Sequence, residues 1–480
     1  MKYSPTIGLE IHVELSTQSK MFCNCSAKYF GELPNTHVCP VCLGLPGAMP
    51  VPNQQAIQSL IMLGLALEGT IPPASKFDRK NYFYPDLPKG YQISQFDLPF
   101  TSDLKLKISD RYIKIERAHM EEDTAKLTHT DGRTLIDFNR SGVPLIEIVS
   151  TPDLFSADEA VAYAQEIQRV VRYLGISDAD MEKGQMRFDA NISVSAKKRS
   201  LGTKVEIKNL NSFRSLKSAI EFEIDRQIVA LNKGEKVLQE TRGYSQAKNQ
   251  TVAQRSKESA HDYRYFPEPD IPIIEIKKTQ VAQIKEQIPL LPDEERSDLT
   301  EKYGLEASLA SDFVDRPEIL SFFKQAVSDY ETTFDQDSTV RGHAVKIANW
   351  LASTVLFTLK EKNLNINDLK ITPASIAELV YLVDQKRISS TQAKEVYEIM
   401  LTDGRMPQAI VEKDGFSVLS DQSELEPVIE AIIQANPKVV EDYRAGKTTV
   451  LQYLIGLVMA QTKGKADPSL TRQLLEQKLN

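Results

Sequence analysis

Four cysteines are the only thiols in the chain, and all of them fall between positions 23 and 42. They form two close pairs, Cys23 with Cys25 and Cys39 with Cys42. Two short chelating pairs can place four thiolates around a tetrahedral Zn2+ with little strain in the chain. Two disulfide bonds or four unrelated buried thiols are the alternatives, although disulfides are rare in chains without a secretory signal. The spacing favours a closed, structural zinc site in the loop 21–43.

Charged side chains suited to binding a metal ion or a phosphate lie on three segments in which polar and apolar residues alternate, at 6–15, 186–194 and 204–208. Alternation with a period of two is typical of a half-buried strand, so the polar residues of each segment should share one face. These polar residues are Glu10, His12 and Glu14 in the first segment, Asp189 and Asn191 in the second, and Lys204, Glu206 and Lys208 in the third.

Three consecutive carboxylates occur in His119-Met-Glu121-Glu122-Asp123, which we expect to be a loop. If the sheet brings these groups and the strand residues together, they form a pocket of oxygen ligands flanked by lysines. Such ligands suit Mg2+, and Mg2+ beside lysine suits a nucleoside triphosphate. The alternative is a set of ordinary solvent-facing strand residues, which are normally charged. The residues alone leave both interpretations open.

Three further stretches mix basic and aromatic side chains, at 78–86, 89–95 and 261–268. Interleaved Arg or Lys and Tyr or Phe can bind phosphates while the rings stack on bases. The same composition fits rigid loops, anchored by proline, that pack their rings on the domain. The two interpretations are compatible, and both stay open.

The elements that must position these residues change in kind along the chain. Further strand-like runs lie at 112–117, 134–138 and 145–149. The pattern from Ser156 to Glu159 predicts the start of a helix that ends near Gly175, and a second helix is expected at 215–231. Such alternation favours an antiparallel sheet with one wet face.

After the prolines at 267–292 the strand alternation disappears and helical periodicity takes over. We expect helices at 293–303, 306–314, 317–328 and 344–359 in this part. The sequence therefore predicts an α+β protein with an antiparallel-sheet domain, an all-α domain and a small helical tail domain. The expected limits of these three domains are 1–292, 293–407 and 408–480.

The composition excludes several classes of protein. With 480 residues, 41% hydrophobic and 26% charged, the chain is neither disordered nor fibrous. It has no apolar stretch near the roughly 20 residues of a membrane helix and no apolar signal core, so we expect a cytoplasmic protein with no membrane partner. The net charge of −8 argues against general coating of nucleic acid. Any contact with nucleic acid must therefore be local. The segment 436–480 is a candidate, because it contains seven basic and four acidic residues.

Six motifs of this chain resemble, in order, those of the B-subunit family of tRNA-dependent amidotransferases. They are Ile7-Gly-Leu-Glu-Ile-His-Val-Glu-Leu15, Lys76-Phe-Asp-Arg-Lys-Asn-Tyr-Phe-Tyr-Pro-Asp86, His119-Met-Glu-Glu-Asp123, Lys208-Asn-Leu-Asn-Ser212, Asp262-Tyr-Arg-Tyr-Phe-Pro-Glu-Pro269 and Gln461-Thr-Lys-Gly-Lys-Ala466. The resemblance extends from residue 4 to the end of the chain, so a chance match is not credible. It implies a β-rich cradle domain followed by a helical domain and a helical tail.

The resemblance also implies an activity. Such enzymes use ATP and Mg2+ to phosphorylate the side-chain carboxylate of mischarged Glu-tRNA(Gln), and in many bacteria that of Asp-tRNA(Asn). Ammonia released from glutamine by a partner amidase (glutaminase) subunit then displaces the phosphate, and a small third subunit supports the heterotrimer. With all four cysteines assigned to zinc, no thiol remains for a glutaminase of the cysteine class. The chain should therefore depend on its partner for ammonia.

By similarity to the family, site residues can be assigned in this sequence. The expected Mg2+ ligands and catalytic residues are Glu10, His12, Glu122 and Glu206, and Asp189 is a further expected catalytic residue. The nearest substitutes as Mg2+ ligands are Glu121, Asp123 and Asp189. The expected contacts to ATP phosphates or to the mouth of an ammonia channel are Lys89, Lys204 and Lys208. The expected tRNA contacts are Lys438, Arg444, Lys447, Lys463 and Lys465, for which a solvated helical face is the alternative.

A zinc-stabilised tRNA-binding scaffold without chemistry of its own is the rival function. The carboxylate-rich faces argue against it, because a surface that only binds phosphate would avoid the repulsion of so many acidic groups. In either case zinc should be accessory to folding, since a site closed by four thiolates leaves no position for a substrate.

Overall fold

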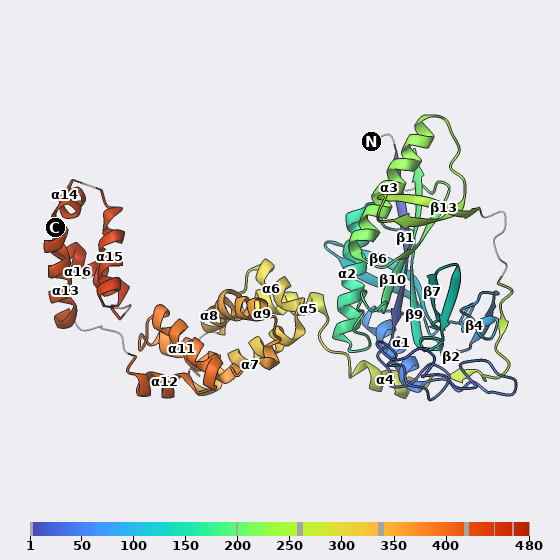
Figure 1. The fold of residues 1–480 in the computed structure, drawn as a ribbon, viewed down its shortest axis with the longest axis horizontal. Helices are drawn as coiled ribbons and strands as arrows, with labels where there is room; N and C mark the ends of the chain where they lie inside the picture. Colours follow the sequence, from blue (N-terminus) through green and yellow to red (C-terminus); the bar gives the residue numbers. More distant parts are fainter. Residues whose placement is uncertain are drawn as a thin grey trace. The chain divides into compact units, whose positions relative to one another are not determined.

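The computed structural model describes residues 3–197, 200–256, 263–334, 340–416, 422–445, 447–462 and 465–479. The chain divides into two compact units, Met1–Asp293 and Glu294–Asn480. The first unit contains the β-sheets and the second is helical (Figure 1), which confirms the predicted α+β class. The predicted domain limits at 292 and 407 remain predictions.

The first unit is built on an eight-stranded sheet with the order β13-β12-β11-β10-β1-β9-β6-β5. Its strands are β1 (Ser4–Glu14), β5 (Thr101–Ile108), β6 (Arg111–Glu122), β9 (Pro144–Ser150), β10 (Met186–Ser195), β11 (Val205–Leu210), β12 (Glu240–Ser245) and β13 (Gln250–Ser256). Neighbouring strands are antiparallel except β11 and β12, which run parallel. The sheet is therefore mixed at this one pair, where a fully antiparallel sheet was expected.

Three smaller sheets accompany the large one. The first has the order β14-β3-β4, and the other two pair β15 with β2 and β7 with β8. Their strands are β2 (Ala74–Ser75), β3 (Asp78–Asn81), β4 (Tyr91–Ser94), β7 (Lys126–Thr130), β8 (Arg133–Asp137), β14 (Phe266–Pro267) and β15 (Ile274–Glu275). The sheet that contains β3 and β4 matters most for function, because its side chains reach the polar face of the large sheet.

The other face of the large sheet is apolar and is covered by helices. Alternate residues of β1, among them Ile7, Leu9 and Ile11, are fully buried in one core cluster with residues of three helices. These helices are α1 (Gln54–Ala66), α2 (Ala157–Tyr173) and α3 (Phe213–Asn232). In Figure 1, α2 and α3 lie along the same side of the strands. A fourth helix of this unit, α4 (Lys278–Lys285), also adds Ile284 to the core.

The predicted start of α2 is confirmed, with one change in detail. The Ser156 hydroxyl accepts a hydrogen bond from the Glu159 backbone N–H over 3.1 Å, as an N-cap does. The Glu159 carboxylate instead accepts from the backbone N–H of Phe155, one residue earlier than a capping box requires. Gly175 has a left-handed φ of 64° directly after the helix end. Such a φ is unfavourable for residues with a Cβ, so glycine suits this position.

One predicted loop is wrong. The segment 119–123 was expected to be a loop, but its residues up to Glu122 belong to β6. The strand pattern is hidden in the sequence because both faces of β6 are buried here, so polar and apolar residues do not alternate. The consequence for the site is direct, since neighbouring residues of a strand point to opposite faces.

The second unit is helical over its described residues. Its helices are α5 (Pro292–Glu301), α6 (Ala307–Val314), α7 (Pro317–Thr333), α8 (Val340–Trp350), α9 (Leu356–Lys362), α10 (Pro373–Asp384), α11 (Ser390–Asp403), α12 (Pro407–Asp414), α13 (Gln422–Ala435), α14 (Pro437–Arg444), α15 (Val450–Gln461) and α16 (Pro468–Leu479). The helix expected at 344–359 is interrupted by a π-helical segment, Leu351–Val355. Residues of α13 to α16 share a separate apolar core. In the described part of the chain, none of the helices has the length and apolar character needed to cross a membrane.

Candidate catalytic site and metal sites

Most of the predicted catalytic and Mg2+-binding residues meet on the polar face of the large sheet. Glu10 and His12 of β1 point to this face because they alternate with the fully buried residues of the strand. The register sets Asp189 of β10 opposite Glu10, and Glu147 of β9 opposite His12. Glu206 comes from β11, the strand next to β10. These four strands therefore contribute one or two acidic or imidazole groups each, and β6 adds His119 and Glu121.

The first acidic group, the Glu10 cluster, consists of Glu10, Asp189 and Glu206. One carboxylate oxygen of each lies within 4.8 Å of the others. The Lys208 ammonium lies 3.1 Å from Asp189 Oδ2 and 3.0 Å from Glu206 Oε1. The Asn191 side-chain amide donates to Glu10 Oε1 over 2.9 Å. The cluster thus consists of three carboxylates, two of which pair with Lys208.

A β-bulge brings Lys208 into this cluster. Around Asp189 the one-to-one register of β10 and β11 is lost, and Lys208 and Asn209 both lie opposite it. Asn209 has a left-handed φ of 60°, and its backbone N–H donates to Asp189 Oδ1 over 2.9 Å. The bulge therefore fixes one oxygen of Asp189 and leaves the other to Lys208. Bulges often serve next to active sites in this way, because they redirect side chains.

The second group, the His12 cluster, consists of His12, Glu121 and Glu147, whose ligand atoms lie within 4.8 Å of one another. Glu147 Oε2 lies 3.6 Å from His12 Nε2 and 3.4 Å from Nε2 of a second histidine, His119. The Nδ1 atoms of both histidines are buried and have no hydrogen-bond partner among the described residues. The His12 cluster therefore brings together nitrogen and oxygen atoms that could act as metal ligands.

Glu121 is held in the His12 cluster by the smaller sheet. Its carboxylate accepts hydrogen bonds from Ser94 Oγ over 2.9 Å and from Gln92 Nε2 over 3.1 Å, both from β4. The Lys80 ammonium of β3 lies 3.2 Å from Glu121 Oε1. Burial opposes ionisation of Glu121, but the charge of Lys80 together with the hydrogen bond and charge of His119 outweighs it and lowers the pKa to about 2. Glu121 is therefore a fixed, ionised carboxylate at neutral pH.

The polar face as a whole stabilises protonated side chains and would stabilise a bound cation. The two clusters are neighbours, since Glu10 and His12 are two residues apart on one strand, roughly 6–7 Å. Burial, followed by the charges of Glu147 and Asp189, raises the pKa of Glu10. Burial opposes a charge on His119, yet the nearby Glu147 carboxylate helps to raise its pKa to about 9. A cation bound here would relieve the repulsion among the carboxylates.

Glu122, which we expected to bind Mg2+ together with Glu10 and His12, lies elsewhere. As the next residue of β6 after Glu121, it points to the opposite side of the strand. Its carboxylate accepts hydrogen bonds from Lys89 Nζ over 2.6 Å and from the Ile93 backbone N–H over 2.9 Å. Lys89 and Glu122 line a cavity of about 190 Å³ that also reaches Cys23 and Cys42.

Two further candidates also lie outside the clusters. Asp123 is fully buried as a side chain and accepts two hydrogen bonds from Arg187, each over 3.0 Å. Its role is therefore that of a buried ion-pair partner. Lys204 is exposed and precedes the first residue of β11, so the structure does not bring it to the carboxylates.

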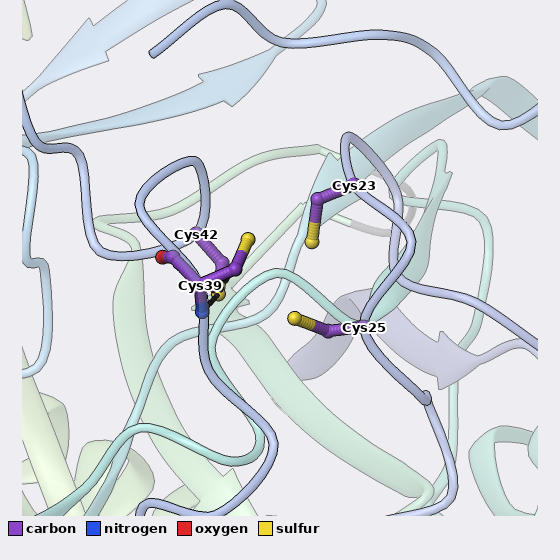
Figure 2. A group of neighbouring side chains, drawn as sticks. All are labelled: Cys23, Cys25, Cys39 and Cys42. Atoms are coloured by element: carbon purple, nitrogen blue, oxygen red, sulfur yellow. Dashed lines mark hydrogen bonds between the residues drawn. The ribbon is translucent and has the colours of Figure 1, made fainter.

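The four cysteines are close together although they come from two separate turns of the loop (Figure 2). Their sulfur atoms lie within 4.8 Å of one another, and all four are free thiols. Sulfurs at 2.3 Å from a tetrahedral Zn2+ would be about 3.8 Å apart. The distance between Cys39 Sγ and Cys42 Sγ is 3.8 Å, so the donor set fits zinc. A hydrogen bond with Cys23, supported by the charge of Lys20, lowers the pKa of Cys42 to about 4.

The predicted tRNA contacts lie in the second unit and differ in their surroundings. Lys438 is exposed on α14, and Lys465 is half-buried before α16. Arg444 Nε donates to the Leu479 backbone carbonyl over 3.1 Å, and Lys447 pairs with Asp442 at 2.8 Å. Lys463 lies outside the described residues, as do His261 and Asp262 of the aromatic stretch.

Sequence reasoning missed three residues of the site: Glu147, His119 and Lys80. Glu147 had a detectable signal, because it is the only charged residue in the apolar strand Pro144–Ser150. A lone carboxylate in such a strand must face either the core or the polar side of the sheet, and only the polar side is tolerable. Lys80 had no comparable signal, since its contact with Glu121 depends on how two sheets pack.

A sheet domain whose polar face gathers carboxylates, histidines and lysines is joined to a helical unit, and two family models match the chain accordingly. The GatB/GatE catalytic domain matches residues 5–282, and the GatB domain matches residues 332–479.

Full-length relatives give a more specific comparison. The B subunit of the aspartyl/glutamyl-tRNA(Asn/Gln) amidotransferase of Gloeothece citriformis is 46% identical over 496 residues, which cover 100% of this chain and 98% of the relative. Proteins with the same name from Caldanaerobacter subterraneus and Roseiflexus castenholzii are 45% and 46% identical over 488 residues, covering 100% of this chain and 100% and 99% of the relatives. The chain belongs to this B-subunit family, as its motifs indicated. Members of the family are glutamine-hydrolysing, tRNA-dependent amidotransferases.

Proposed function

We propose that this chain phosphorylates the side-chain carboxylate of mischarged Glu-tRNA(Gln), Asp-tRNA(Asn) or both, using ATP and Mg2+. The carboxylate oxygen attacks the γ-phosphorus of ATP, and ADP leaves. Ammonia then attacks the acyl carbon of the resulting acyl phosphate, and inorganic phosphate leaves to give the amide. A carboxylate is inert to ammonia at neutral pH, so the phosphorylation supplies the missing leaving group.

The observation that carries this proposal is the pair of neighbouring clusters on one face of the sheet. The Glu10 cluster offers only oxygen donors, which suit Mg2+, and its three carboxylates exceed the charge of Lys208. The His12 cluster adds one nitrogen donor and two carboxylates. Bound Mg2+ would neutralise phosphate oxygens during transfer. We assign Glu121 and Glu147, in place of Glu122, as the carboxylate ligands beside His12.

The lysines around the clusters have distinct proposed roles. Lys208 lies among the carboxylates of the Glu10 cluster, where its ammonium would contact phosphate oxygens of ATP. Lys80 orients Glu121 and remains close to the reacting groups. Lys89 and Glu122 line the cavity on the other side of β6. We assign that pair to the mouth of an ammonia channel, while a phosphate role for Lys204 remains a prediction from the sequence.

We further propose that Zn2+ occupies the cysteine cluster and stabilises the loop 21–43. The cluster supports a closed site with four thiolate ligands, so its contribution is to folding. With the thiols used in this way, ammonia must come from another protein. We propose that this source is an amidase (glutaminase) subunit, and that a small third subunit completes the cytoplasmic heterotrimer.

The tail of the second unit is our proposed contact with the tRNA backbone. Its local positive charge, with Lys438 exposed on α14, supports this assignment. A scaffold without chemistry would need such a basic surface but would not need the two acidic clusters.

The reconstituted heterotrimer provides the test. Glu10→Gln and Glu147→Gln should each remove tRNA-dependent ATP hydrolysis and amide formation, while the glutaminase activity of the partner is retained. Glu116→Gln is the matched control, because Glu116 is an exposed carboxylate of β6 outside both clusters. Normal acyl-phosphate formation by the two cluster variants would refute the ligand assignment. Absence of ATP turnover by the unmodified heterotrimer with mischarged tRNA would favour the scaffold.

A further inference from the structure

Four aromatic rings form a connected row beside the His12 cluster, and none of them has a role in the function proposed above. Phe96 and Tyr265 stack with their centroids 4.4 Å apart and their planes at 13°. Tyr263 contacts Tyr265 edge to face at 6.1 Å, and Tyr82 contacts Tyr263 in the same way at 5.9 Å. We call these four residues the aromatic row.

The outer end of the row is open to solvent. Phe96 is 56% exposed although one face of its ring is covered by Tyr265. A planar ring stacked on one side and open on the other can extend the stack by one more flat group. The other three rings of the row are each half-buried, so they support Phe96 and cannot offer the same surface.

The row is held rigidly from both sides. The Phe96 backbone N–H donates to the buried Asp78 carboxylate over 2.9 Å. Strand β14 begins at Phe266, directly after Tyr265, and pairs with β3. The buried Glu268 follows this strand and accepts two hydrogen bonds from Arg79 of β3, 2.7 and 2.8 Å long. A surface fixed in this way loses little conformational entropy when a ligand stacks on it.

The row also lies next to the reacting groups. The Lys80 ammonium is 5.3 Å from the Tyr263 ring centroid and 3.2 Å from Glu121 Oε1. Phe96 follows Ser94 by two residues, and the Ser94 hydroxyl donates to the same carboxylate over 2.9 Å. The aromatic row and the His12 cluster are therefore adjacent, with Lys80 in contact with both.

From this arrangement we infer that Phe96 is the stacking surface for the unpaired terminal base of the mischarged tRNA. This inference rests on the proposed function. The amino acid is esterified to the ribose of the terminal nucleotide, so a carboxylate placed at the clusters brings that base close to them. Single-stranded RNA ends are commonly bound by aromatic stacking with cations nearby, as Lys80 provides here. The adenine of ATP is the competing ligand, but it is separated from the reacting phosphorus by the whole triphosphate and ribose.

The test compares two tRNAs and two variants in the reconstituted heterotrimer. One tRNA ends in its complete CCA sequence and the other lacks the terminal adenosine. Phe96→Ala should weaken binding of the complete tRNA by about 5- to 150-fold, the range for loss of one base–aromatic stack. It should leave binding of the shortened tRNA unchanged, because that RNA lacks the terminal base that is proposed to stack on Phe96. Phe96→Tyr should restore binding of the complete tRNA.

The controls separate this inference from its alternatives. Phe30→Ala removes a ring that is 63% exposed and outside the row, and it should affect neither tRNA. Equal loss with both tRNAs would indicate a structural role for Phe96 and overturn the inference, and so would unchanged binding of the complete tRNA. An increased KM for ATP with normal tRNA binding would assign the ring to ATP instead. If the unmodified heterotrimer failed to turn over ATP with mischarged tRNA, the proposed function itself would fail.

Discussion

Glu121 and Glu122 are consecutive residues of β6, yet their carboxylates serve two separate environments. Glu121 accepts a hydrogen bond from Ser94 Oγ over 2.9 Å and belongs to the His12 cluster. Glu122 accepts from Lys89 Nζ over 2.6 Å and lines a cavity on the other side of the strand. One step along a strand thus places two adjacent carboxylates in different surroundings.

This division predicts opposite behaviour of two adjacent, isosteric variants. Glu121→Gln should reduce tRNA-dependent ATP hydrolysis on the order of 100-fold, because it removes a charged ligand for the metal. Glu122→Gln should leave ATP hydrolysis within a few-fold of normal but impair amidation with glutamine. Both activities can be measured on one preparation of the heterotrimer.

Added ammonium salt provides the control for the channel assignment. It should restore amidation by Glu122→Gln, since free ammonia does not need the channel mouth, and should not rescue Glu121→Gln. The assignment of Glu122 would be wrong if its variant lost ATP hydrolysis as completely as the Glu121 variant does.

The strands that position the site could largely be predicted from the sequence, whereas the set of residues that form the site could not. Alternation placed Glu10 and His12 on the polar face because β1 has one buried and one polar side. Glu121 and Glu122 could not be told apart, since both faces of β6 are buried there and the alternation is lost. Lys80 reaches the site only through the packing of two sheets, a contact between residues far apart in sequence that leaves no local signal.

The buried Lys20 should control how tightly the cysteine cluster binds zinc. Its ammonium lies 3.7 Å from Cys42 Sγ and donates to the His37 and Phe138 backbone carbonyls over 2.7 and 3.2 Å. Four thiolates around Zn2+ leave a net negative charge, which this ammonium offsets inside the protein. Lys20→Met should therefore lower zinc affinity by about 10- to 100-fold, the usual effect of losing a group that supports a metal ligand.

Competition with a chelator, followed by zinc analysis, measures this affinity. Lys28→Met is the matched control, because Lys28 is an exposed lysine of the same loop. Unchanged zinc retention by Lys20→Met would show that the ammonium has no part in the site. Chelation of the unmodified chain should also lower its melting temperature, since the loop loses its cross-link.

The ion pair between the buried Asp123 and the half-buried Arg187 should make a large contribution to stability. Arg187→Met would leave the Asp123 carboxylate with Arg140 as the remaining arginine, 3.8 Å away. Breaking a buried pair by removing one partner costs about 3–5 kcal/mol, and we expect a loss of about 3 kcal/mol because Arg140 remains. Arg117→Met, which affects a more exposed pair with Glu116, should cost less than about 1 kcal/mol.

The stability difference should depend on pH with a definite sign. Burial opposes ionisation of Asp123, but Arg187 and Arg140 outweigh it and hold its pKa well below the usual range. A lowered pKa in the folded state stabilises the protein above the unfolded pKa, about 3.9, and this stability is lost as the pH falls. Urea unfolding should show the full stability difference between the unmodified chain and Arg187→Met at neutral pH, and a difference that shrinks as the pH falls below about 4. A constant difference would contradict the ion-pair assignment.

Two lysines of the tail should contribute unequally to tRNA binding. Lys438 is exposed on α14, whereas Lys447 lies 2.8 Å from the Asp442 carboxylate, which offsets its charge. Each phosphate contact releases counterions, so losing one lowers the slope of log Kd against log salt concentration by about one unit. Lys438→Gln should reduce the slope by that amount, and Lys447→Gln by less. Titrations at several salt concentrations measure both slopes, and an unchanged slope for Lys438→Gln would exclude its contact with the tRNA backbone.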